Sequence, residues 1–66
     1  MNDTYAIIFT DENGNPDFSQ RAVYVEYNVA DADLEAAMTK ITTVTEAIKV
    51  LEPNRNFGIF RMESIA

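Results

Sequence analysis

Residues 31–52, DADLEAAMTKITTVTEAIKVLE, dominate the architecture of this 66-residue chain. Their apolar residues recur at spacings of three and four, the pattern of an amphipathic helix: Leu34, Ala37, Met38, Ile41, Val44, Ile48 and Leu51. Asp31 or Asp33 is expected to cap this helix, and Pro53 ends it. Residues 41–45 are all β-branched and weaken helix propensity, yet the long period continues on both sides of them. The sequence therefore predicts one helix over residues 31–52.

Three short stretches outside this helix are typical of strands. Residues 21–29, RAVYVEYNV, alternate strictly, with Val23, Val25 and Tyr27 on one face and Ala22 and Tyr24 on the other. Residues 56–65, NFGIFRMESI, are expected to form a further strand after the helix. Residues 4–10, TYAIIFT, are apolar on both faces, which favours a central position in the sheet. The polar residues 11–20, with the Asn13-Gly14 pair and Pro16, form the loop between the first two strands.

The element order is therefore ββαβ in a single small α+β domain over residues 1–66. The long helix returns the chain along the sheet, so the last strand runs parallel to residues 21–29. The apolar first strand is expected in the middle, which gives the strand order 2-1-3. We expect Val23, Val25 and Tyr27 to pack under the helix and Tyr24 to lie on the opposite face, which one helix leaves uncovered.

The composition argues against several classes of function. The chain contains no histidine and no cysteine, which removes the usual catalytic bases, nucleophiles and thiolate metal ligands. No P-loop or GxGxxG motif occurs. We therefore expect a protein that is not an enzyme and takes no cofactor. The absence of a signal peptide or a long apolar run predicts a cytoplasmic protein.

The loop at residues 11–17, DENGNPD, starts like a calcium loop, with oxygen-bearing side chains at its first, third and fifth positions. The pattern then fails, because Pro16 stands where glycine is needed and Ala22 stands where a bidentate glutamate is needed. A polar hairpin loop explains the stretch better than a cation site, so no metal site is predicted.

The charge distribution and the aromatic residues indicate binding surfaces. The net charge is −6, which disfavours direct binding to nucleic acid or to an anionic membrane and favours a basic protein partner. Asp31, Asp33 and Glu35 are expected to form an acidic end at the helix start, although helix capping explains each of them singly. Tyr24 and Phe60 are the expected anchors on the uncovered sheet face, because one helix cannot bury all seven aromatics.

Two hypotheses of function follow. In the first, the chain is an acidic regulator or inhibitor that docks on a basic, nucleic-acid-handling host protein, in the manner of a nucleic-acid mimic encoded by a phage or mobile element. In the second, it is a structural subunit that forms a homodimer or a larger assembly through the uncovered sheet face or a sheet edge. The outer helix face carries small and uncharged residues at Ala36, Thr39, Thr43, Ala47 and Val50, which would allow another backbone to approach closely. An ordinary solvent-exposed surface explains these residues better.

Overall fold

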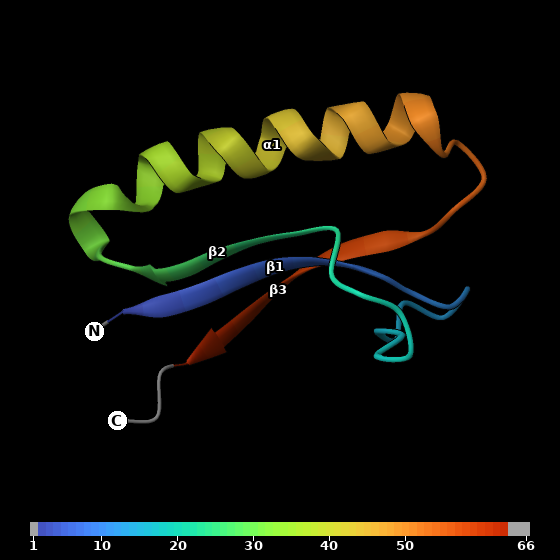
Figure 1. Cartoon of the computed structure of the whole chain (residues 1–66), viewed down its shortest axis with the longest axis horizontal. Helices are drawn as coiled ribbons and strands as arrows, with labels where there is room; N and C mark the ends of the chain where they lie inside the picture. Colours follow the sequence, from blue (N-terminus) through green and yellow to red (C-terminus); the bar gives the residue numbers. More distant parts are fainter. Residues whose placement is uncertain (1, 64–66) are drawn as a thin grey trace.

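The computed structural model describes residues 2–63, which form one three-stranded sheet with a long helix on one face (Figure 1). The strands are β1 (Asp3–Phe9), β2 (Tyr24–Val29) and β3 (Phe57–Glu63). A short 3-10 turn, η1 (Asp31–Asp33), leads into the helix α1 (Leu34–Leu51). The predicted α+β class and ββαβ order are confirmed.

The strand order is β2-β1-β3, as the sequence predicts. Both outer strands pair with β1 in the antiparallel sense, so β2 and β3 run in the same direction and α1 carries the chain back between them (Figure 1). β1 takes the middle position because it is buried on both faces: Ile7 is 0% and Ile8 is 5% exposed. A strand with two apolar faces leaves the least apolar surface in contact with water when it lies between two other strands.

The helix and β2 are shorter than the sequence predicts, whereas β1 keeps seven residues and is shifted by one position. β1 ends at Phe9, and β2 begins at Tyr24 instead of residue 21. The preceding Val23 still bonds to the sheet, because its N–H donates to the carbonyl of Ile7 at 2.8 Å. The last two residues of the strand predicted over 56–65 lie outside the described residues.

The start of the helix differs from the prediction in its capping. Residues 31–33 form the 3-10 turn η1, and Asp33 occupies the N-cap position of α1 without a capping hydrogen bond from its side chain. Its backbone N–H instead donates to the carbonyl of Ala30 at 2.9 Å. Asp33 thus takes the N-cap position that the sequence predicts, without the expected hydrogen bond from its side chain. The carboxylates of Asp31 and Asp33 still lie in the first turn of η1, where acidic side chains suit the helix dipole.

The core lies between α1 and the face of the sheet that α1 covers, which we call the helix-side face. Its centre is formed by Ile7 of β1 with Ile41 and Ile48 of α1. The partly buried hydrophobic residues packed around them are Tyr5, Phe9, Val23, Tyr24, Met38, Val44 and Phe57. The central part of the predicted apolar stripe is thus directed at the middle strand, whereas its two end residues, Leu34 and Leu51, are 37% and 78% exposed.

The prediction of which β2 residues face the helix is wrong for three positions. Tyr24 packs against the core, whereas Val25 and Tyr27 lie on the opposite face of the sheet. The alternation of β2 also changes phase near its end, because the register with β1 shifts between Asp3 and Tyr5. Asn28 lies in the bulge with a φ of 50°, a left-handed conformation that asparagine tolerates better than most residues.

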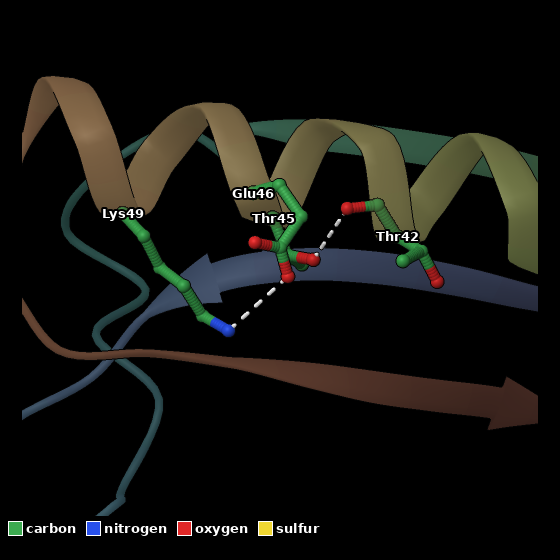
Figure 2. A network of polar contacts seen from close by, with 4 residues as sticks. All are labelled: Thr42, Thr45, Glu46 and Lys49. Atoms are coloured by element: carbon green, nitrogen blue, oxygen red, sulfur yellow. Dashed lines mark hydrogen bonds and ion pairs between the residues drawn. The ribbon is translucent and has the colours of Figure 1, made fainter.

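The β-branched segment of α1 is helical, which confirms the helix prediction over residues 41–45. Its threonines direct hydroxyls back to the helix: the Thr45 hydroxyl donates to the carbonyl of Thr42 at 2.8 Å (Figure 2). Next to it, Lys49 and Glu46 form an exposed ion pair of 3.3 Å along the same helix (Figure 2). The back-bonded hydroxyl satisfies the one buried polar side chain recorded for the described residues, Thr45, which is 8% exposed. In the part of the chain that the structure describes, no helix has the length and apolar character to cross a membrane.

Candidate partner-binding site

The face of the sheet opposite α1, which we call the open face, carries a hollow. The chain between β1 and β2 passes on the side of the sheet away from α1 (Figure 1). The hollow therefore has a floor of strand residues and a wall of loop residues. Its volume is about 380 Å³, which lies within the range of small-ligand or side-chain pockets. The lining residues of this sheet hollow are Thr4, Ala6, Ile8, Phe18, Gln20, Ala22, Val25, Tyr27 and Met62.

The sheet hollow combines a buried floor with exposed apolar walls. Ala6 and Ile8, which form the floor, are 1% and 5% exposed. By contrast, Phe18 is 78%, Tyr27 is 74% and Met62 is 44% exposed. No lining residue is charged. Large apolar side chains that remain in water around a hollow are typical of a contact site for another molecule.

The loop that supplies Phe18 is fixed by polar contacts on both of its flanks. The backbone N–H of Asp17 donates to the carbonyl of Phe9 at 2.8 Å, which ties the loop to the end of β1. The Asp17 carboxylate accepts from the Ser19 N–H at 3.0 Å and from the Gln20 side-chain amide at 2.8 Å. The wall of the hollow is therefore held in place before a partner arrives, which lowers the entropy cost of binding.

A second anchor of this loop comes from the connection between α1 and β3. Arg55 donates to the side-chain carbonyl of Gln20, and its guanidinium lies 3.5 Å from the centre of the Phe9 ring. Cation–π contacts of this kind favour a planar guanidinium over an aromatic face. Gln20 thus links Asp17 to Arg55, and the hollow is bordered by a polar network that spans two loops.

The first turn of the loop is organised by Asp11. Its carboxylate accepts from the backbone N–H groups of Asn13 and Asn15, each at 2.9 Å. Gly14 follows in the turn with a φ of +85°, a left-handed conformation that suits glycine. The Asp11 carboxylate is thus committed to closing the hairpin loop. Among residues 2–63 no cluster of three or more acidic side chains is placed to hold a metal ion.

These hydrogen bonds lower the pKa values of both loop aspartates. For Asp11 the main cause is the backbone N–H of Asn15, and for Asp17 it is the side chain of Ser19, followed by that of Gln20. A carboxyl whose pKa is lower in the folded state stabilises the fold above its unfolded pKa. That stabilisation is lost as the pH falls through the folded pKa.

We expect the melting temperature to fall on acidification below the ordinary carboxyl value of 3.8, in part because Asp11 and Asp17 become protonated. A variant carrying both Asp11→Asn and Asp17→Asn should melt lower at neutral pH and lose less on acidification. Thermal melts followed by circular dichroism from neutral pH to about pH 2 measure the difference. Glu12→Gln, on the same exposed loop, is the matched control. Parallel pH profiles for the double variant and the wild type would contradict the assignment.

The residues predicted as partner contacts do not lie on one surface. Tyr24 pairs with Ile7 on the helix-side face, and its hydroxyl donates to Glu26. That hydrogen bond, with burial and the charge of Glu26 as further causes, raises the pKa of Tyr24. Phe60 pairs with Ala6 and therefore belongs to the open face. The placement of Tyr24 on the uncovered face is wrong, while that of Phe60 is confirmed.

The predicted acidic end is less uniform than the sequence suggests. Asp31, Asp33 and Glu35 are exposed at η1 and the start of α1. However, Asp33 borders a second hollow of about 250 Å³, between β2 and α1, that Lys40 also lines. At the nearby end of β1, Asp3 forms an ion pair of 3.8 Å with Arg61. The structure thus places two cations, Lys40 and Arg61, close to the predicted acidic end.

Sequence reasoning missed three of the residues that form the sheet hollow: Phe18, Tyr27 and Met62. The strand pattern assigned Tyr27 to the core and gave no reason to link Phe18 to the sheet. The one available signal was Phe18 itself, an aromatic residue in an otherwise polar loop. Comparisons of the chain with protein-family models, with curated proteins and with solved structures found no match.

Proposed function

We propose that this protein is a non-enzymatic binding module that holds a partner protein on the open face of its sheet. The observation that carries the proposal is the sheet hollow, with its buried floor and its exposed walls of Phe18, Tyr27 and Met62. A hollow of this size accepts one or two large apolar side chains, and aromatic anchors in such pockets supply most of the affinity of an interface.

The charge of the chain supports a basic partner. The net charge is −6, while the lining of the sheet hollow is uncharged. The distributed carboxylates attract a basic surface from a distance, and the uncharged hollow then binds an apolar side chain of that surface. The partner that fits best presents an aromatic or leucine side chain flanked by lysines or arginines. A nucleic-acid-handling protein is one source of such a surface.

Replacing Phe18 by serine is expected to abolish capture of the partner without unfolding the domain. Phe18 is 78% exposed, so its removal costs the fold little, yet it forms a wall of the hollow. Leu51→Ser is the matched control, because Leu51 is equally exposed at 78% but lies at the end of α1, outside the lining. The measurement is affinity capture from a lysate of the source organism with wild type, Phe18→Ser and Leu51→Ser.

The same experiment at low and high salt tests the electrostatic part. Capture by the wild type should weaken as salt screens the attraction between the acidic domain and a basic partner. A captured protein that is retained equally by wild type and Phe18→Ser, or that Leu51→Ser alone loses, would place the contact outside the sheet hollow and overturn the proposal.

A further inference from the structure

The two edges of the sheet are protected unequally. β2 and β3 form the edges, because β1 lies between them (Figure 1). β2 carries the bulge at Asn28, a common device that makes an edge strand unsuitable for pairing with another chain. β3 instead keeps an unbroken register with β1 over all seven of its residues and contains no proline or lysine. A straight, weakly charged edge strand is a template for a further strand.

The hydrogen-bonding pattern shows which backbone groups point toward that edge. The N–H of Thr10 donates to the carbonyl of Asn56 at 2.9 Å, so Thr10 and Asn56 form a hydrogen-bonded pair and the backbone groups of Asn56 point toward β1. Along two antiparallel strands, hydrogen-bonded pairs alternate with non-hydrogen-bonded pairs, so successive residues point their backbone groups to opposite sides of the strand. The backbone groups of Gly58 and Phe60 therefore face β1, and those of Phe57 and Ile59 point away from it.

Apolar side chains line this edge on both faces of the sheet. Ile59 lies beside Ile7 on the helix-side face and is 50% exposed, because α1 does not cover it. Met62 lies beside Thr4 on the open face and is 44% exposed. Residues 53–63 contain two arginines and one carboxylate, Glu63, in a chain whose net charge is −6. Two copies of this acidic chain therefore repel each other least along β3.

We propose that two copies of the chain pair through β3, antiparallel and around a two-fold axis at Phe60. The pairing joins two three-stranded sheets into one, with both helices on the same side. A two-fold axis perpendicular to the sheet preserves its faces, and directly opposed residues must share a face. The axis must therefore pass at one residue, which then lies opposite its own copy, because an axis between two residues would oppose side chains from different faces.

Among these registers, the one centred on Phe60 pairs the whole of β3 and opposes no like charges. Phe60 then lies opposite Phe60 of the second copy, on the open face, where aromatic pairs are favourable. Ile59 lies opposite the aliphatic stem of the second copy's Arg61. A register centred on Arg61 would instead set two guanidinium groups against each other and leave part of β3 unpaired.

The area of the contact predicts a weak dimer. A seven-residue strand and its side chains bury less than the roughly 1,200 Å² typical of stable complexes. We therefore expect a dimer that dissociates on dilution. Added salt should strengthen it by screening the repulsion between two chains of net charge −6, whereas salt weakens capture of a basic partner. The opposite salt dependence keeps the two interactions separable, and the dimer does not depend on the proposed function.

Sedimentation velocity from low-micromolar to millimolar concentration tests the proposal. The wild type should pass from monomer to dimer, while Ile59→Lys stays monomeric because a charge now stands on the edge. Val50→Lys is the matched control: it adds the same charge at a position on α1 that is 79% exposed, and it should dimerise like the wild type. Circular dichroism verifies that both variants are folded. A wild type that stays monomeric at every concentration overturns the proposal.

The register has its own test, which the absence of cysteine makes clean. Phe60→Cys places two thiols opposite each other in a close, non-hydrogen-bonded pair, a geometry that allows a disulfide. Met62→Cys, on the same strand and face, places its thiol opposite Gly58 of the second copy. Under mild oxidation with copper phenanthroline, Phe60→Cys should give a covalent dimer much faster than Met62→Cys. Equal rates, or a faster reaction of Met62→Cys, overturn the Phe60-centred register.

Discussion

Replacing Ile41 by alanine is expected to destabilise the protein by about 3 kcal/mol and to leave a large fraction of molecules unfolded. Ile41 is 1% exposed on α1 and packs against Ile7 of β1, which is 0% exposed, and Ile48. Truncating a fully buried isoleucine removes its burial and leaves a cavity. A domain of this size has only about 3–5 kcal/mol of total stability, so one such loss consumes most of it. Urea unfolding followed by circular dichroism measures the change.

Two controls separate packing from helix formation. Ile41→Val removes one methylene and should cost about 1 kcal/mol. Val50→Ala lies on the same helix at a position that is 79% exposed, and it should change stability by less than about 0.5 kcal/mol. If Ile41→Ala unfolded at the same urea concentration as Val50→Ala, the packing of α1 on the middle strand would be disproved.

The helix and the strand order could be predicted because each follows from a long, redundant signal. Seven apolar residues keep the helical period through the β-branched stretch, so no single residue decides the outcome. The middle position of β1 follows from Ile7 and Ile8, adjacent apolar residues that must be buried on opposite faces. Both predictions depend on how many apolar residues an element must bury, and this number can be counted directly from the sequence.

The face assignment of β2 could not be predicted because it depends on one residue of local geometry. Tyr24 and Val29 lie five residues apart and would fall on opposite faces of a regular strand. In the structure, Tyr24 packs on the core and Val29 is 8% exposed beside Asp3, since the bulge at Asn28 shifts the alternation by one residue. The apolar run Val23, Val25 and Tyr27 therefore gave a misleading pattern.

The sheet hollow could not be predicted from the sequence either, because its residues come from four separate segments. Ala6, Val25 and Met62 lie on three different strands, and Phe18 reaches them only through the folded path of the loop. That path depends on contacts such as those of Asp17 with Phe9 and of Gln20 with Arg55. Long-range contacts of this kind leave no periodic trace in the chain.

The two tyrosines of β2 are expected to separate stability from binding. Tyr24→Ala should destabilise the domain by about 2 kcal/mol, because its half-buried ring packs against the Ile7–Ile41 core. Tyr27→Ala should change stability by less than about 0.5 kcal/mol, because this side chain is 74% exposed. Only Tyr27 lines the sheet hollow, so only Tyr27→Ala should lose the partner at a temperature where both variants are folded.

The comparison is informative because the same chemical change is made twice on one strand, three residues apart. Urea unfolding gives the stability of each variant, and affinity capture well below both melting temperatures gives its binding. A destabilised Tyr24→Ala that still captures the partner, together with a stable Tyr27→Ala that does not, locates the contact on the open face. The reverse pattern, with binding lost only in Tyr24→Ala, would return the contact to the helix-side face and contradict the site proposed here.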